Sequence, residues 1–142
     1  FNLKEVIWAV TKKNPFKNKS SLKLKDRIKI AKKLSLKNKF IKIRFLENKA
    51  KSNKTIDLIN YFKKNKKYKK IYFIMGADNL INFHKWKKWK QILLKCNIIV
   101  FDRAKYKAKS LKSITYKKFN KKGLKFITFK KVNISSSQLR KI

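Results

Sequence analysis

The stretch that decides the fold is "IMGADNLINFHKWKKW", residues 74–89. It continues an apolar, strand-like run, "KIYFIM" (70–75), which stops at Gly76. Asp78 follows, and then come the chain's only His and two of its three Trp. A buried strand that ends at a glycine and is followed by a helical pattern predicts a βα unit with polar groups at the strand's carboxyl end.

The same alternation of strand and helix extends in both directions along the chain. Apolar or alternating runs predict strands at 5–10, 40–47, 69–76, 97–102 and 123–132. Helices are expected at 22–36, 55–65 and 110–119, and a helix or helix pair at 79–95. This order predicts one α/β domain over residues 1–142, with a mostly parallel sheet flanked by helices.

The first predicted helix has a recognisable start and an apolar stripe. Ser20 or Ser21 is expected as its N-cap, because a serine hydroxyl accepts a hydrogen bond from a free backbone N–H. Its stripe consists of residues at helical spacing, namely Leu24, Ile28, Ala31 and Leu34 or Leu36.

The charge of the chain is extreme, with 43 Lys and Arg against 6 Asp and Glu. A polyanion partner such as RNA or DNA is one interpretation of the net charge of +37. An A/T-rich genome is the other, because Lys, Asn and Ile are abundant while Gly, Pro, Ala and Arg are scarce. A dedicated nucleic-acid reader would favour Arg, whose planar fork makes paired hydrogen bonds. We therefore favour compositional bias, and the rare residue types become informative where they occur.

Several classes of protein and site are excluded or disfavoured. No apolar run approaches the roughly 20 residues of a membrane helix, so no membrane partner is expected. The single cysteine, Cys96, allows no internal disulfide and fits a reducing cytoplasm. One histidine and one cysteine cannot build a Cys/His metal cluster, so we expect no metal-binding side chains there. No catalytic triad, paired carboxylates or glycine-rich phosphate loop is visible.

In an open α/β sheet, ligands gather at the carboxyl ends of the strands. Gly76 lies at such an end, where it allows close approach of the backbone or a positive φ. Asp78 is interpreted either as a helix N-cap or as a carboxylate that binds ribose hydroxyls. Arg103 follows the next strand, where it either contacts ligand or is solvated.

Aromatic residues recur at helical spacing after this strand end. Phe83 and Trp89 are expected in the core, whereas Trp86 is a candidate to stack on a flat aromatic ligand. The segment "ISSSQLR" (134–140) places hydroxyls and a guanidinium at a helix start, which suits a phosphate. A serine N-cap beside an exposed arginine is the alternative explanation of that segment.

Five motifs, in this order, carry a resemblance to a known family: "NPFK" (14–17), "TIDL" (55–58), "FIMGADNLINFHKWKKWKQI" (73–92), "VFDR" (100–103) and "ISSSQLR" (134–140). Together they resemble the bacterial nicotinate-nucleotide adenylyltransferases from about Glu5 to Arg140. The resemblance implies a Rossmann-like nucleotidyltransferase fold. It also implies transfer of AMP from ATP to nicotinate mononucleotide, with Mg²⁺, in NAD biosynthesis.

The resemblance also implies roles for individual residues. Those expected to bind nicotinate mononucleotide are Thr55, Trp86 (stacking on the nicotinate ring) and the backbone N–H of Lys87. Those expected to bind ATP are Gly76, Asp78, Asn79, Arg103, Ser136, Ser137 and Arg140. Lys17 and Arg140 are the expected catalytic residues, since they approach the reacting phosphates.

The chain also departs from the family pattern. The family's G-x-F-x-P-x-H-x-G-H segment and its first strand are not present, and we expect truncation at both ends and an inactive fragment. Leu58 stands where the family usually has Thr, and "AKYK" replaces the usual turn after Arg103. A basic nucleic-acid-binding protein and a catalytically dead remnant are the alternative functions. No dedicated nucleic acid is expected, and homo-oligomer formation stays open.

Overall fold

The computed structural model describes residues 1–12, 22–65, 68–120 and 122–128. The chain divides into two compact units, Phe1–Asn65 and Lys66–Ile142, and each is described by itself. The expectation of a single domain over residues 1–142 stays a prediction. Among the described residues, no helix has both the length and the apolar character needed to cross a membrane.

Among its described residues, the first unit contains a two-stranded parallel sheet and three helices. Strand β1 (Val6–Ala9) pairs with β2 (Ile41–Arg44), so that Val6 lies opposite Ile41 and Ala9 opposite Arg44. The helices are α1 (Leu24–Ser35), α2 (Glu47–Ala50) and α3 (Thr55–Lys64). Alternating burial along β2 confirms the predicted strand, and buried Ile56 and Ile59 confirm the helix predicted at 55–65.

Helix α1 differs from its prediction at both ends. Its N-cap is Lys23, which makes no side-chain capping bond, and Ser20 and Ser21 lie outside the described residues. Ala31 is its one buried residue, whereas Leu34 and Leu36 are 54% and 75% exposed. The predicted stripe is wrong at this end because α1 packs mainly against β2, and a single short strand covers only part of a helix face.

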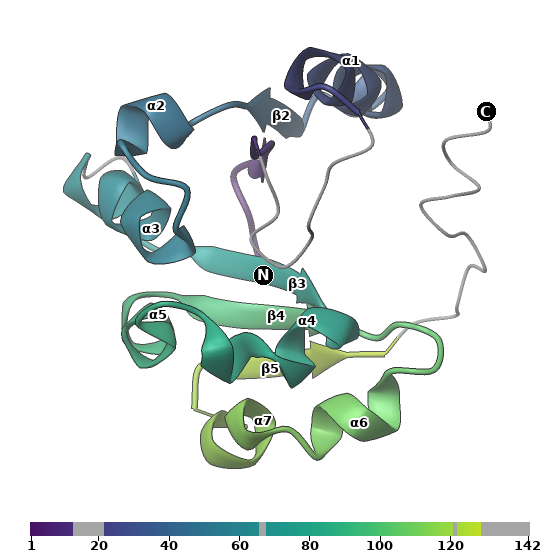
Figure 1. Ribbon diagram of the computed structural model, residues 1–142, viewed down its shortest axis with the longest axis vertical. Helices are drawn as coiled ribbons and strands as arrows, with labels where there is room; N and C mark the ends of the chain where they lie inside the picture. The colour runs from purple at the N-terminus through teal and green to yellow at the C-terminus, as the bar shows by residue number, and fades with distance from the viewer. Residues whose placement is uncertain (13–21, 66–67, 121, 129–142) are drawn as a thin grey trace. The chain divides into compact units, whose positions relative to one another are not determined.

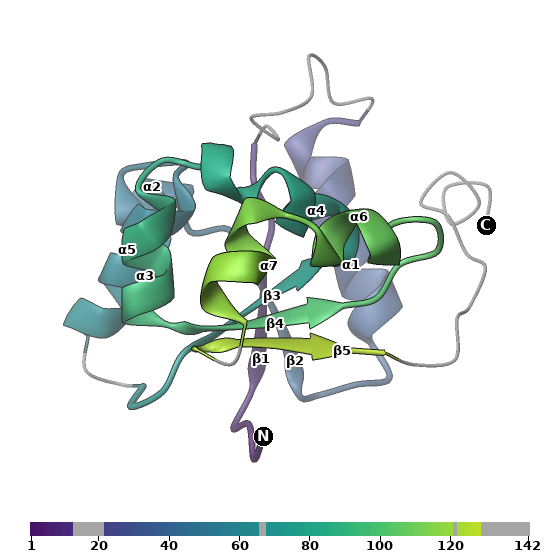
Figure 2. The same cartoon turned by 90° about the horizontal axis from the view of Figure 1, so that it is seen from below.

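The described part of the second unit is built on three parallel strands, β3 (Tyr72–Gly76), β4 (Asn97–Phe101) and β5 (Leu124–Ile127). Strand β4 lies between the other two, and Ile98, Ile99 and Val100 along it are buried. Figure 2 shows α4 (Ala77–Ile81), α6 (Lys107–Leu111) and α7 (Ile114–Phe119) over one face of this sheet. Every strand pair among the described residues is parallel, as the sequence predicted.

The helix or helix pair predicted at 79–95 is in fact three segments. They are α4, the 3₁₀ turn η1 (Phe83–Lys85) and α5 (Trp89–Lys95), drawn in teal and green in Figure 1. Periodicity did not show the interruptions, since the apolar spacing continues through them. The chain leaves the helical conformation at Trp86 and passes through a left-handed Lys88, with φ 54° and ψ 36°.

The helix predicted at 110–119 is two helices, α6 and α7. They divide at Ser113, whose hydroxyl caps α7 by accepting a hydrogen bond from the Tyr116 N–H at 3.2 Å. Strand β5 confirms the first part of the strand predicted at 123–132, and residues from 129 onward lie outside the described residues.

The aromatic residues of the second unit meet the prediction in part. Phe83 is fully buried, as expected of a core residue. Trp89 is only half-buried, and its ring packs edge-on against Phe119 at 5.6 Å and Phe83 at 6.4 Å. These contacts attach α5 and η1 to α7, and so support the turn that carries Trp86.

Candidate functional site

The parallel register of β3 and β4 brings two of the rare residues together. Gly76, the last residue of β3, lies opposite Phe101, the last residue of β4. Asp78 and Arg103 each follow by the same short offset. The Arg103 guanidinium donates a hydrogen bond from Nη1 to Asp78 Oδ2 at 2.7 Å. The predicted ATP residues of these two strand ends therefore form one cluster.

Gly76 is required here by space and not by backbone conformation. Its φ is −81° and its ψ is 157°, so of the two alternatives that the sequence left open, a positive φ is not the one adopted. A Cβ at this position would lie 2.5 Å from Asp78 Oδ1, closer than real Cβ atoms approach. The absence of a side chain at Gly76 therefore allows the Asp78 carboxylate to sit against the end of β3.

Asp78 does not act as a helix N-cap. The N-cap of α4 is Gly76, no side-chain capping bond is made, and Asp78 lies in the first turn. Its Oδ2 accepts from Arg103, while its Oδ1 is buried and has no hydrogen-bond partner among the described residues. Because an unsatisfied buried oxygen costs about 1–3 kcal/mol, Asp78 Oδ1 favours a hydrogen-bond donor from water or from a ligand. Asn79 follows it and is exposed.

Tyr106 belongs to this cluster and was not singled out by the sequence. The Arg103 guanidinium carbon lies 5.9 Å from the centre of its ring, and the Tyr106 N–H donates to the Arg103 carbonyl at 3.0 Å. The Tyr106 side chain is 40% exposed. The sequence could have indicated it, because Tyr106 follows Arg103 by three residues and a tight turn brings residues at that spacing together.

Trp86 lies in the break between η1 and α5. Its ring packs against Phe83 with centroids 5.1 Å apart and against Phe73 with centroids 5.9 Å apart. The residue is half-buried, so packing orients the ring while part of it remains accessible. Lys87 is exposed, and among the described residues no backbone carbonyl accepts its N–H.

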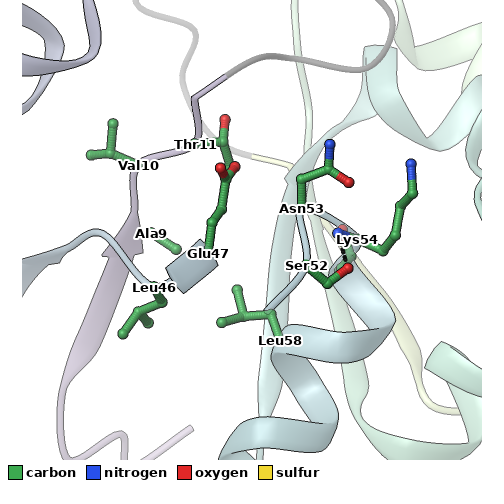
Figure 3. Close-up of a pocket in the computed structure, with 10 residues that line it drawn as sticks. Ala9, Val10, Thr11, Leu46, Glu47, Ser52, Asn53, Lys54 and Leu58 are labelled. Atoms are coloured by element: carbon green, nitrogen blue, oxygen red, sulfur yellow. Dashed lines mark hydrogen bonds between the residues drawn. The ribbon is translucent and has the colours of Figure 1, made fainter. Parts of the chain in front are cut away.

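A small pocket of about 50 Å³ lies in the first unit (Figure 3). Its lining residues come from the end of β1 and the residues after it, the start of α2, the loop into α3 and the first turn of α3: Ala9, Val10, Thr11, Leu46, Glu47, Ser52, Asn53, Lys54, Thr55 and Leu58. Thr55 is the first residue of α3, whose N-cap Lys54 makes no side-chain capping bond. The first N–H groups of a helix have no acceptor within the helix and favour a nearby anion. Thr55 therefore lies where a carboxylate would be stabilised.

The loop before α3 is ordered by two hydrogen bonds at Ser52. Its hydroxyl donates to Asp57 Oδ2 at 2.6 Å and accepts the Lys54 N–H at 3.1 Å, the latter dashed in Figure 3. Asp57 thus has a defined partner, in addition to its expected place in the first turn of the helix.

Four predicted residues lie outside the described residues: Lys17, Ser136, Ser137 and Arg140. Of the others, Thr55 belongs to the first unit and Trp86 and Lys87 to the second. The structure brings Gly76, Asp78 and Arg103 together. Among the described residues, no group of three or more His, Cys, Asp or Glu is arranged to hold a metal ion.

Comparisons with known proteins agree with the resemblance that the sequence motifs carry. The sequence model of the cytidylyltransferase-like family matches residues 1–142. A probable nicotinate-nucleotide adenylyltransferase of Pelagibacter ubique is 70% identical over 140 residues, covering 99% of this chain and 77% of that protein. One of Bradyrhizobium sp. (strain ORS 278) is 37% identical over 102 residues, covering 71% of this chain and 53% of that protein.

A solved structure shares the fold. Plasmodium falciparum nicotinic acid mononucleotide adenylyltransferase, complexed with NaAD, superposes with a TM-score of 0.72 at 19% identity. The match covers 98% of this chain and 69% of that one. The predicted nucleotidyltransferase fold, with parallel strands flanked by helices, is thereby confirmed.

The chain belongs to the cytidylyltransferase-like family of nucleotidyltransferases. Its 70% identity with the Pelagibacter protein, over nearly all of its length, places it among the nicotinate-nucleotide adenylyltransferases. The resemblance predicted from the motifs is confirmed.

Proposed function

We propose that the protein transfers AMP from ATP to nicotinate mononucleotide, releasing pyrophosphate and forming nicotinate adenine dinucleotide in NAD biosynthesis. The observation that carries this proposal is the 70% identity with the Pelagibacter relative over 140 residues. The Asp78–Arg103 cluster at two adjacent strand ends supports it, because nucleotides bind at such ends in parallel α/β sheets. We propose the cytoplasm as the compartment of this reaction, since a chain with a single cysteine forms no internal disulfide.

ATP would be held at the carboxyl ends of β3 and β4. Gly76, Asp78 and Asn79 would bind the adenosine ribose. A carboxylate such as that of Asp78 accepts hydrogen bonds from the vicinal hydroxyls, and the amide of Asn79 can both accept and donate them. Arg103 would lie beside the adenine or the triphosphate. The motif "ISSSQLR" adds three further expected ATP ligands, Ser136, Ser137 and Arg140.

Nicotinate mononucleotide would be recognised by its flat ring and its carboxylate. The half-buried Trp86 offers a ring face for stacking, and the Lys87 N–H and the Thr55 hydroxyl are donors for the carboxylate. An amide in place of the carboxylate would lose the charge-assisted hydrogen bonds, so we expect preference for the acid form.

The reaction needs no covalent nucleophile from the protein. A phosphate oxygen of nicotinate mononucleotide attacks the α-phosphorus of ATP, and the bond from that phosphorus to the bridging oxygen of pyrophosphate breaks. The rate enhancement would come from positioning of the two substrates and from neutralisation of the phosphate charge. Lys17 and Arg140 would supply positive charge beside the phosphates.

Mg²⁺ fits this chemistry as an ion carried largely by ATP. It is commonly bound through one or two carboxylates, water and substrate phosphates, and not by a cage of protein side chains. When bound, it would neutralise charge on the triphosphate. The Asp78 carboxylate of the site accepts a hydrogen bond from Arg103 through Oδ2.

A direct assay tests the proposal. The assay uses the complete protein, since this chain by itself is expected to be inactive. The complete protein is incubated with ATP, Mg²⁺ and either nicotinate mononucleotide or its amide, and pyrophosphate and dinucleotide are measured. We expect both products with the acid form and much less with the amide. Pyrophosphate formation that is independent of mononucleotide, or a clear preference for the amide, would contradict the proposal.

A further inference from the structure

The backbone of Lys12 is held on both sides by rare charged residues of the first unit. Its N–H donates to Glu47 Oε1 at 3.0 Å, and its carbonyl accepts from Arg27 Nη1 at 3.1 Å. Glu47 is one of only 6 acidic residues in a chain with 43 Lys and Arg. Its separation from Lys12 is 35 residues, and that of Arg27 is 15 residues.

These two hydrogen bonds have a specific geometric effect. The N–H and the carbonyl of Lys12 belong to the two peptide groups on either side of its Cα. Holding both groups restricts both backbone dihedrals of Lys12, and therefore the direction in which the chain leaves β1. Each bond has one charged partner, which makes it stronger than a bond between neutral groups.

The pocket lies at the same point of the chain. The ladder between β1 and β2 continues to Val10, whose N–H donates to the Arg44 carbonyl at 2.8 Å. Thr11 lies between this last ladder bond and the fixed Lys12, and it lines the pocket together with Val10 and Glu47 (Figure 3). The wall formed by Thr11 is thus secured at both of its ends.

We infer that Glu47 and Arg27 are positioning residues that fix the Lys12 backbone and so keep the Thr11 wall of the pocket in its binding geometry. This inference rests on the proposed function, in which Thr55 on the same pocket binds nicotinate mononucleotide. Glu47 acts here as a hydrogen-bond acceptor for the backbone, since its carboxylate charge would not favour an anionic ligand. Arg27 acts as the matching donor from α1.

Two removing and two conservative substitutions test this inference. Glu47→Ala and Arg27→Met should each raise KM for nicotinate mononucleotide about tenfold, with kcat and the KM for ATP much less affected. Glu47→Gln keeps an acceptor and Arg27→Lys keeps a donor, so both should stay near the wild type. The double variant Glu47→Ala/Arg27→Met should lose less than the product of the single effects, because both residues fix one backbone position.

The chain offers matched controls for the removal of each charge. Asp26→Ala removes an exposed acidic residue in the same unit, and Arg44→Met removes an exposed arginine at the end of β2. Both should leave the KM for nicotinate mononucleotide unchanged. If Glu47→Ala and Arg27→Met behave like these controls, the inference is wrong.

Amide hydrogen exchange gives a readout that does not depend on activity. The Lys12 N–H should be protected in the wild type and in Glu47→Gln, and should exchange at least tenfold faster in Glu47→Ala. An inactive wild type with this exchange pattern would overturn the proposed function and leave the fixed backbone established. Equal exchange in all variants would overturn the positioning role, whatever the activity.

Discussion

The guanidinium of Arg103 donates a hydrogen bond to the carboxylate of Asp78, with Nη1 and Oδ2 2.7 Å apart. The two side chains are 50% and 26% exposed, so the pair is accessible to solvent. Exposed pairs of this kind contribute at most about 1 kcal/mol to stability. The value of this pair therefore lies in the orientation of the two side chains at the strand ends.

The first prediction concerns Arg103. Arg103→Met should raise the KM for ATP by about tenfold or more, because a charge-assisted contact and the orientation of Asp78 are both lost. Its free energy of unfolding should change by less than about 1 kcal/mol. Steady-state kinetics and thermal unfolding measure the two effects. A large loss of stability with an unchanged KM for ATP would contradict a role in binding.

The second prediction concerns Gly76. In Gly76→Ala the new Cβ would lie 2.5 Å from Asp78 Oδ1, so the carboxylate must move. We expect a stability loss of about 1–3 kcal/mol and a weaker affinity for ATP, measured by calorimetry.

Gly123→Ala is the control for this substitution. Its φ is +87°, so alanine is strained there, but the nearest atoms to the new Cβ are at ordinary distances of 3.7 and 3.9 Å. It should lower stability by about 1 kcal/mol without changing the affinity for ATP. Equal effects of the two substitutions on ATP binding would refute the steric explanation for Gly76.

The third prediction concerns Trp86. Trp86→Ala removes a ring that packs on Phe83 and Phe73, and should cost about 3 kcal/mol of stability as well as raising the KM for nicotinate mononucleotide. Trp86→Phe keeps an aromatic face, so it should retain most of the stability and most of the affinity for nicotinate mononucleotide.

Trp89→Phe provides the comparison for this series, since Trp89 packs on Phe83 and Phe119 and has no proposed ligand. Kinetics with varied nicotinate mononucleotide should separate the two positions. If Trp89→Phe raises that KM as much as Trp86→Ala does, the effect of Trp86→Ala comes from disturbed packing of the turn and not from lost stacking on the ligand.

The fourth prediction concerns Lys88, which has φ 54° in the turn that presents the Lys87 N–H. Lys88→Gly permits this conformation and should preserve the KM for nicotinate mononucleotide. Lys88→Val should raise it severalfold and cost about 1–2 kcal/mol, because a β-branched residue is disfavoured at positive φ.

Lys105→Val is the matched control for Lys88→Val, since Lys105 is another exposed lysine with positive φ, at 69°. It should lower stability to a similar extent without changing that KM. Thermal unfolding and kinetics on the same preparations provide the measurement. An unchanged KM in Lys88→Val, despite a clear loss of stability, would show that the backbone conformation at Lys88 has no part in binding.

Much of the fold followed from local sequence patterns. Apolar or alternating runs located β1 to β5, and the order of strands and helices predicted parallel pairing. Patterns of this kind succeed because burial of one face is a local property of a strand or helix. They failed at Trp86–Lys88, where the apolar spacing continues although the helix does not, and lysine carries no signal for a positive φ.

By itself, the sequence determined the order of the strands, the approximate positions of most helices, the family motifs and the candidate residues at the strand ends. Only the tertiary structure decided which of those residues meet. Asp78 and Arg103 are 25 residues apart, and they pair because the parallel register sets Gly76 opposite Phe101. Glu47 reaches Lys12 across 35 residues in the same way. Periodicity encodes which face of an element is buried, whereas side-chain contacts between distant residues depend on how the elements pack.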